Sequence, residues 1–245
     1  MDKICCLILN YNLGRMTDKL FEELHLCIDS DTNVIVLDAS DKLSGLSIFA
    51  NKRIEDDYYG ENFRKELEIQ VAKNEYDWYI MMSNDIYNLP KMNWIRNLTD
   101  LANRQNAVIV TPHINKEGTS HRVMHRHNDV YGFRYVNWID FQTPIIHHSI
   151  MKEALKKWDN TLKYGWGIDS LFGIECYNRG LNIIISDEIG VCHYDKKTFK
   201  ENEDKLSLQQ YRQRAMTGER VFLIKHYGEA LYNDWIRNLR TMESK

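Results

Sequence analysis

Short apolar runs alternate with amphipathic stretches over the first half of the chain. The continuous runs, rich in branched or aromatic residues, predict buried strands, and the stretches with apolar residues three or four apart predict helices. The predicted strands are residues 4–9, 34–37, 78–82 and 107–110, and the predicted helices are residues 16–26, 63–73 and 92–103. Strands separated by helices in this order are typical of an α/β fold with a mostly parallel central sheet flanked by helices.

The pattern is less regular after residue 111. Residues 113–135 are polar, rich in His and Arg, and predict a long loop or a hairpin. Residues 136–158 predict a strand that leads into a helix, 165–180 a helix flanked by glycines, and 181–195 a strand and a turn. Residues 199–245 have helical spacing and predict two closing helices. We therefore expect one domain over residues 1–198 and a C-terminal helical extension over 199–245.

Composition narrows the class of protein. Of the 245 residues 43% are hydrophobic, which is ample for a packed core, and the net charge of -3 gives no overall basic field for nucleic acid or anionic lipid. Five scattered cysteines in apolar surroundings predict reduced thiols rather than disulfides or a zinc site. No apolar run is long enough for a membrane span and no signal peptide is evident. These features predict a soluble, cytoplasmic protein.

Polar residues directly follow four of the predicted strands, where open parallel sheets bind their ligands. Neither a GxGxxG sequence nor a GxxxxGK[ST] sequence follows the first strand, which argues against the usual dinucleotide site and the usual P-loop. Asp85 and His193 offer an oxygen and an imidazole nitrogen, which suit Mn²⁺ or Mg²⁺ bound to a diphosphate. The four polar groups are Asn10-Tyr11-Asn12, Asp38-Ala39-Ser40-Asp41, Ser83-Asn84-Asp85 and Cys192-His193-Tyr194-Asp195.

The order of these strand ends, with Gly165-Trp166-Gly167-Ile168-Asp169 between the third and the fourth, resembles the GT-A glycosyltransferases, particularly inverting family 2. The likeness covers roughly residues 3–198. It implies a GT-A fold and transfer of a sugar from a nucleotide-diphosphate donor, with a UDP-sugar favoured. It also implies a seat for the nucleotide at Asn10, Tyr11, Asn12, Asp38, Ser40 and Asn84, a metal site at Asp85 and His193, a catalytic base at Asp169, and an acceptor or sugar site that includes Trp166, Gly167 and Arg126.

Two positions depart from the family pattern. Ser83 stands at the first carboxylate position of the DxD-type motif, which leaves Asp85 as its one carboxylate and puts metal use in question. The acidic pair of the family's acceptor-side motif is reduced to Asp169, which leaves a single candidate base there.

Each site residue also has a purely structural interpretation. Asp169 can cap the helix that follows it, Asp85 can belong to a turn, and His193 can be a satisfied structural residue. Asp38 can simply end its strand, although a carboxylate there can also accept hydrogen bonds from a uracil or a ribose. Trp166 between two glycines predicts a mobile stacking platform for a sugar, or a core residue.

The acceptor is open at this level. The resemblance favours a glycan or a lipid-linked saccharide. The segment 120–135 combines His and Arg, including Arg126, with aromatic residues, which also suits phosphate contact and base stacking on DNA, for instance at a hydroxymethylated pyrimidine. A catalytically inactive sugar-nucleotide or partner-binding module is the third alternative, because of Ser83. The sequence does not decide between inversion and retention, nor the oligomeric state.

Overall fold

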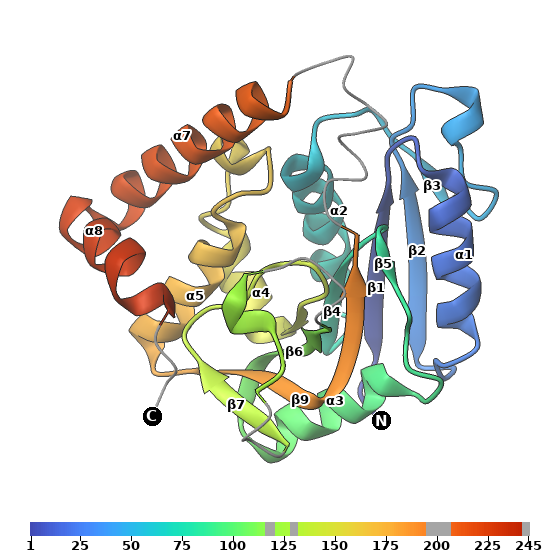
Figure 1. The fold of residues 1–245 in the computed structure, drawn as a ribbon, viewed down its shortest axis with the longest axis horizontal. Helices are drawn as coiled ribbons and strands as arrows, with labels where there is room; N and C mark the ends of the chain where they lie inside the picture. Colours follow the sequence, from blue (N-terminus) through green and yellow to red (C-terminus); the bar gives the residue numbers. More distant parts are fainter. Residues whose placement is uncertain (116–120, 128–131, 195–206, 242–245) are drawn as a thin grey trace.

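The computed structural model describes residues 1–115, 121–127, 132–194 and 207–241. In these ranges one sheet of nine strands is flanked by helices (Figure 1). The strands are β1 Ile4–Asn10, β2 Thr32–Asp38, β3 Lys52–Arg53, β4 Trp78–Ser83, β5 Ile86–Tyr87, β6 Ala107–Ile114, β7 Phe133–Val136, β8 Ile145–His147 and β9 Asn182–His193. The helices are α1 Gly14–His25, α2 Tyr59–Lys73, α3 Trp94–Arg104, α4 His148–Leu155, α5 Ile168–Arg179, α7 Leu208–Tyr227 and α8 Glu229–Arg237, with short 3₁₀ turns η1 Leu43–Gly45, η2 Arg122–Met124, η3 Asn160–Leu162 and η4 Leu239–Thr241.

The sheet is mixed, in the order β3-β2-β1-β4-β8-β6-β9-β5, with β7 paired to β9. Strands β1, β2, β3 and β4 are mutually parallel, as the alternation of strands and helices predicts. The short strand β8 is antiparallel to both β4 and β6 and joins this parallel half to the parallel pair β6 and β9. The α/β class with a flanked central sheet is therefore confirmed, and antiparallel strands complete it.

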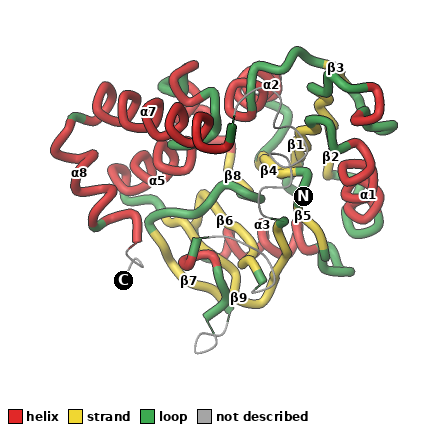
Figure 2. Tube along the Cα trace, turned by 45° about the horizontal axis from the view of Figure 1, so that its top comes forward, coloured by secondary structure: helices red, strands yellow, loops and turns green. Residues whose placement is uncertain are grey.

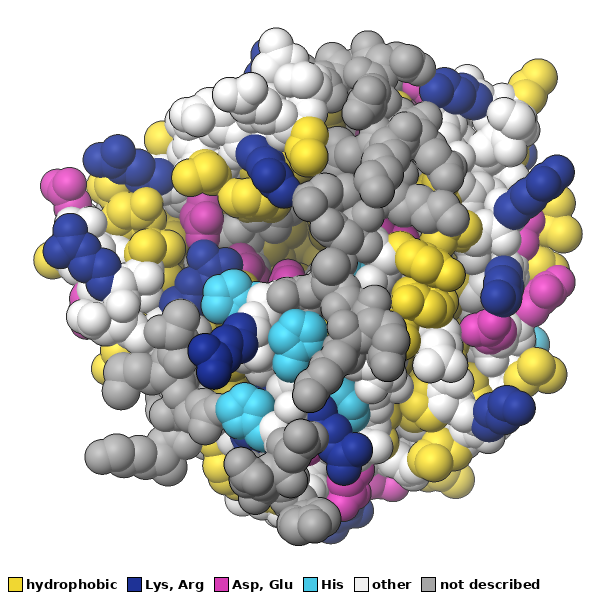
Figure 3. Space-filling model, in the orientation of Figure 1, with side chains coloured by type: hydrophobic (Ala, Val, Ile, Leu, Met, Phe, Trp, Pro, Cys, Tyr) yellow, Lys and Arg dark blue, Asp and Glu magenta, His cyan; other side chains and the backbone are white. Residues whose placement is uncertain are grey.

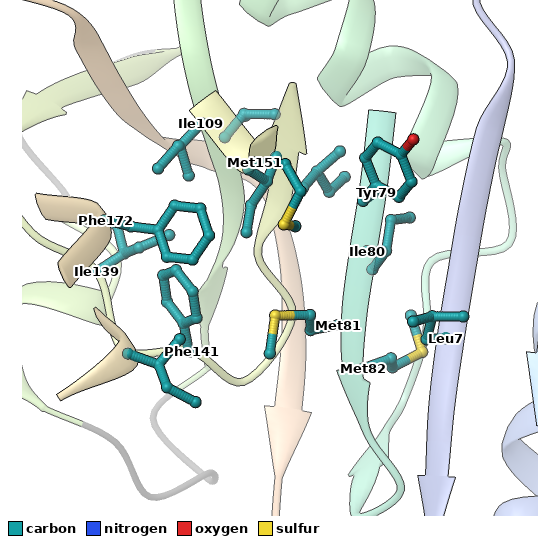
Figure 4. Packing of buried hydrophobic residues seen from close by; sticks show 14 of the residues in the cluster. Leu7, Tyr79, Ile80, Met81, Met82, Ile109, Ile139, Phe141, Met151 and Phe172 are labelled. Carbon is teal, nitrogen blue, oxygen red and sulfur yellow. The ribbon is translucent and has the colours of Figure 1, made fainter. Parts of the chain in front are cut away.

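The core lies on both sides of the central strands. All seven residues of β1 are buried, because helices cover both faces of a sheet of this kind. Adjacent residues of β4 point to opposite faces, so Met81 and Met82 enter different halves of the core (Figure 4). On the Met81 side, Phe141 packs against Phe172 of α5, with ring centroids 5.1 Å apart.

The segment 113–135 differs from the loop or hairpin that its polar character predicts. Strand β6 continues to Ile114, and β7 pairs with β9 rather than returning along β6. The sequence of β7 does not show a strand pattern, because the polar Arg134 stands at a position that points into the protein. There its Nε donates a hydrogen bond of 2.8 Å to Asp187. Both side chains of this ion pair are almost completely buried. Likewise β9 is one strand of twelve residues, where the sequence predicts a strand and a turn.

The two closing helices predicted near the C-terminus are present as α7 and α8. Ser207 and Gln210 form a capping box at the start of α7. Figure 2 shows α7 and α8 beside α5, and Tyr227 at the end of α7 donates a hydrogen bond of 2.6 Å to Glu175 of α5. The expected boundary between residues 198 and 199 lies outside the described residues.

Two further expectations concern the chain as a whole. All five cysteines are free and buried in the structure, in apolar surroundings as the sequence predicts. None of the helices in the described ranges combines the length and the apolar character needed to cross a lipid bilayer.

Candidate active site

The strand ends singled out from the sequence meet at one edge of the sheet. The parallel register pairs Asn10 at the end of β1 with Asp38 at the end of β2, and pairs Leu9 with Ser83 at the end of β4. The end of β9 joins them through the antiparallel pairing of His193 with Ile86 of β5. Side chains from four segments far apart in the chain therefore share one site.

Asn10 is the centre of a buried hydrogen-bond network. Its side chain is completely buried and has a partner for every polar group, so it fixes the loops around it rather than offering free groups to a ligand. Its oxygen accepts hydrogen bonds from Leu13 N at 3.1 Å, Thr17 Oγ1 at 2.9 Å and Asn84 Nδ2 at 3.3 Å, and its amide donates to Ser40 Oγ at 3.0 Å and Gly45 O at 2.8 Å.

Asp38 and the loop after it are similarly constrained. Asp38 is 2% exposed. Its carboxylate accepts hydrogen bonds from the backbone N–H groups of Ser40 at 3.0 Å and Ser47 at 2.8 Å. Asn12 adopts a left-handed backbone conformation with φ of 56°. Asn12 and Tyr11 both contact Asp41 at the surface. Of the predicted nucleotide residues, Tyr11 and Asn12 therefore lie nearer the solvent, whereas Asn10, Asp38 and Asn84 are buried beneath them.

Asp85 and His193 lie side by side. The Nε2 atom of His193 is 3.4 Å from Oδ1 of Asp85, and the backbone N–H of Tyr194 donates to the Asp85 carbonyl at 3.0 Å. Ser83 donates a hydrogen bond of 2.7 Å to the same Oδ1 atom. Ser83 therefore orients the Asp85 carboxylate.

This pair fits a divalent ion only as part of a larger ligand set. No cluster of three or more His, Cys, Asp or Glu side chains suited to a metal is found among the described residues. Mg²⁺ and similar ions are commonly held by one or two carboxylates together with water and substrate phosphates. Asp85 and His193 offer two ligands of such a set, one carboxylate oxygen and one imidazole nitrogen.

Asp169 occupies the first turn of α5, where the helix dipole stabilises a negatively charged side chain. Its Oδ1 accepts from the N–H of Ser170 at 2.8 Å, and its Oδ2 is 3.1 Å from Nη2 of Arg240 in η4. Gly167 before it has a φ of 87°, and a Cβ there would lie 3.0 Å from the side chain of Glu219. Gly167 therefore serves close packing of α7 as well as the turn, while Trp166 is 40% exposed.

Sequence reasoning misses two acidic residues that the fold brings to Asp169. Burial, and after it the charge of Asp169, raise the pKa of Asp140 and likewise the pKa of Glu219 on α7. Asp140 lies beside the end of β4, because Ser83 N donates to Gln142 O at 3.0 Å and Gln142 Nε2 donates to Asp140 at 3.1 Å. The one available signal is a single acid in the apolar run Trp138–Phe141. Clustered carboxylates with displaced pKa values are typical of functional sites.

Asp140 links the two halves of the site. The charges of His193 and Arg240 both lower its pKa, against the larger effects of burial and Asp169. Tyr59 of α2 donates to Phe141 O at 3.2 Å, and the charges of Asp85 and Asp140 add to the effect of burial in raising the pKa of its phenol. The Asp85 side and the Asp169 side therefore form one continuous polar site.

Basic residues lie on the same face of the molecule. Figure 3 shows His side chains gathered with Lys or Arg near the middle of one face, beside a hollow with acidic side chains. His121, Arg122 and Arg126 are exposed in or next to η2. Arg134 holds this segment in place by donating to the carbonyls of Val123 and His125. Arg126 acts electrostatically on His113 of β6, and no contact in the described ranges joins it to Trp166 or Gly167.

A sheet of this order with polar strand ends and flanking helices is a GT-A-like glycosyltransferase fold, as solved structures show. No protein-family model matches the sequence, and no curated protein matches it. The similar structures include residues 1–349 of TarS from S. aureus, with a TM-score of 0.57 and 12% identity over 98% of this chain and 76% of that one. The same TarS fragment in complex with UDP gives a TM-score of 0.58 and 13% identity over 98% and 76% of the two chains.

A third similar structure is the mannosyltransferase PcManGT from Pyrobaculum calidifontis in complex with GDP-Man and Mn²⁺. Its TM-score is 0.59 at 10% identity, over 97% of this chain and 76% of that one. The expected GT-A resemblance is thus confirmed at the level of the fold.

Proposed function

We propose that the protein is a glycosyltransferase that moves a sugar from a nucleoside-diphosphate donor to a hydroxyl group of a glycan or a lipid-linked saccharide. The observation that carries the proposal is the convergence of Asp85, His193, Asp140 and Asp169 at the sheet edge of a GT-A-like fold. Similar folds hold UDP in one case and GDP-Man with Mn²⁺ in another, which supports a nucleotide-sugar donor and leaves the sugar to experiment.

In the proposed reaction, the acceptor oxygen bonds to the anomeric carbon while the bond from that carbon to the diphosphate oxygen breaks. The hydroxyl proton passes to Asp169, and the nucleoside diphosphate leaves with the bonding electrons. One displacement of this kind inverts the anomeric centre and needs no enzyme nucleophile. Half-buried Asp140 and buried Glu219 lie near Asp169 with raised pKa values, and clustered carboxyl groups with displaced pKa values are typical of sites of proton transfer.

Asp85 and His193 are the residues that we propose to hold Mn²⁺ or Mg²⁺ with the donor diphosphate. A bound divalent ion supplies charge neutralisation for the leaving group. The separation of 3.4 Å between the two side chains supports a shared ligand, and Ser83 keeps Asp85 oriented for it. Tyr11 and Asn12 are the residues best exposed to contact the nucleotide, and the network of Asn10, Asp38, Ser40 and Asn84 supports them from below.

A thermal-shift panel tests the donor and the metal together. UDP-, GDP-, CMP- and TDP-linked sugars are each added with and without Mn²⁺, because a ligand that binds only the native state raises its melting temperature. We expect one nucleotide class, with UDP favoured, to give a shift that depends on Mn²⁺ and is lost in Asp85→Ala. A panel without any shift counts against the nucleotide site and supports an inactive partner-binding module, and an Mn²⁺-dependent shift that survives in Asp85→Ala contradicts the metal site.

A DNA acceptor is the second candidate, and the exposed His121, Arg122 and Arg126 beside the site favour it. Binding that neutralises phosphates weakens steeply with salt. Titration of a labelled single-stranded and double-stranded DNA at 50 mM and 200 mM salt separates the two acceptor classes. Salt-sensitive binding that is reduced in Arg122→Ala and Arg126→Ala favours DNA, and no binding at 50 mM removes it.

A further inference from the structure

The C-terminal segment reaches back to the proposed base. Arg240 of η4 places Nη2 at 3.1 Å from Oδ2 of Asp169 and Nη1 at 3.8 Å from Oε1 of Glu219. The same Glu219 oxygen accepts a hydrogen bond of 2.8 Å from Ser170 Oγ. Glu219 and Arg240, two residues from beyond the expected GT-A domain, therefore lie next to the Asp169 side chain.

The Arg240 side chain is held by its neighbours. Its guanidinium carbon lies 4.2 Å from the ring centroid of Trp138, a distance at which an aromatic face attracts a cation. Its side chain is 25% exposed, against 12% for Asp169 and 11% for Glu219. A planar guanidinium can donate to two carboxylates at once, which a lysine ammonium at the same place does less well.

The charges around Asp169 explain why a fixed cation matters. Glu219 on α7 and Asp140 before β8 both face it, and burial and Asp169 raise the pKa of each. Arg240 acts in the opposite direction on both groups, and His121 and His193 also favour ionised Asp140. Removal of Arg240 would leave three neighbouring carboxyl groups with little positive charge close to them.

We propose that Arg240 is a positioning residue of the transfer reaction, which holds the Asp169 carboxylate in orientation for the acceptor hydroxyl and so makes the C-terminal segment 207–241 part of the active site. This inference rests on the proposed function, because it takes Asp169 as the base. Arg240 keeps its own proton throughout, since a guanidinium does not deprotonate in proteins. The acceptor proton goes to Asp169, whose carboxylate oxygens each have a second lone pair.

The test compares Arg240→Met, Arg240→Lys and the control Arg237→Met, an exposed arginine on α8 of the same segment. UDP or GDP release is measured with UDP-glucose and GDP-mannose in the presence of Mn²⁺, with water and with simple glycosides as acceptors. We expect kcat to fall about 10- to 100-fold in Arg240→Met, since small displacements of a catalytic group have effects of this size. Donor affinity stays within about twofold, Arg240→Lys recovers part of kcat, and Arg237→Met behaves as wild type.

The pH profile separates positioning from general damage. A neighbouring cation favours an ionised carboxylate and a neighbouring anion disfavours it. The acid limb of kcat/KM is therefore expected to move to higher pH by about one unit in Arg240→Met and to lower pH in Glu219→Gln. A structural role for Arg240 lowers activity or melting temperature without these opposite displacements.

Three outcomes overturn the inference: wild-type kcat with an unmoved profile in Arg240→Met, an equal loss in Arg237→Met, or a parallel loss of donor binding in Arg240→Met. Asp169→Asn keeps this failure distinct from failure of the proposed function. Turnover retained in Asp169→Asn contradicts Asp169 as the base and with it the proposed reaction. Turnover lost in Asp169→Asn and kept in Arg240→Met removes the role of Arg240 alone.

Discussion

The two sides of the candidate site are built in different ways. On the side of β1 and β2, Asn10 and Asp38 are buried and each polar group has a neutral partner in the chain. On the side of α5, the carboxyl groups of Asp140, Asp169 and Glu219 crowd together against one arginine. The first side satisfies its polar groups and gains rigidity, whereas the second concentrates charge that folding alone does not need.

This contrast separates support from chemistry. Satisfied buried networks stabilise and specify one arrangement of loops. Carboxyl groups with raised pKa values decrease stability at neutral pH, and such groups are kept mainly where a protein uses them. Substitutions on the two sides should therefore affect different quantities, which makes the comparison testable.

The largest effect is expected from Asp169→Asn. The substitution keeps size and a hydrogen-bond acceptor and removes the proposed base, which contributes about 10²- to 10⁴-fold to rate in comparable reactions. We expect that loss in nucleoside-diphosphate release, with donor affinity unchanged. Asp100→Asn, at an exposed position on α3, is the control. A turnover close to wild type in Asp169→Asn would show that this carboxylate is a helix-terminal residue only.

Asn10→Ala should act on stability instead. The substitution removes the hydrogen bonds that the Asn10 side chain makes to Thr17, Asn84 and Gly45, while Asn84 still donates to Thr17 and Ser40 still donates to Gly45. Each lost hydrogen bond costs about 0.5–1.5 kcal/mol. We expect the free energy of unfolding in urea to fall by about 2–4 kcal/mol, with the exposed Asn97→Ala as the control. Unchanged stability together with lost nucleotide binding would instead make Asn10 a direct ligand residue.

Continuous apolar runs made the first half of the fold predictable. Strands β1, β2 and β4 lie within two residues of their predicted bounds at either end, because strands buried on both faces leave a strong local signal. Strand β7 has no such local signal, because its inward-pointing Arg134 is compensated by an ion pair with Asp187, which lies 53 residues further along the chain. The local pattern of apolar and polar residues therefore predicts a strand or helix well only when its buried positions are apolar and its exposed positions are polar.

The two sides of the site differ in the same respect. Asn10, Asp38 and Asp85 follow predicted strands, so their common edge could be foreseen from topology. Arg240 is 71 residues from Asp169, and Glu219 lies on a largely polar helix, so neither position is marked in the sequence. Asp140 stands in an apolar run without any motif. Tertiary packing alone brings these three charged groups to Asp169.

Asp140→Asn is expected to have the smallest effect of the three substitutions, and its effect is a gain in the free energy of unfolding rather than a loss. Because burial and Asp169 raise the pKa of Asp140 above its ordinary value, the folded state binds its proton more tightly than the unfolded state does. Stability then falls as the pH rises from about 4 through the folded pKa, and the group weakens the protein at neutral pH. We expect Asp140→Asn to be more stable than wild type by about 1 kcal/mol at pH 7.5.

Urea unfolding of both proteins between pH 4.5 and 8 checks this sign. The asparagine keeps an acceptor for Gln142, so the difference measures mainly the charge of this half-buried carboxyl group. It should shrink as the pH approaches the ordinary range of a carboxyl group, and Asp100→Asn should show no such trend. If Asp140→Asn is less stable than wild type at pH 7.5, the Asp140 charge of the wild type is well compensated by its neighbours. Asp140 would then resemble Asn10, whose polar groups all have partners. A gain in stability with a loss of turnover would place Asp140 with the residues kept for chemistry.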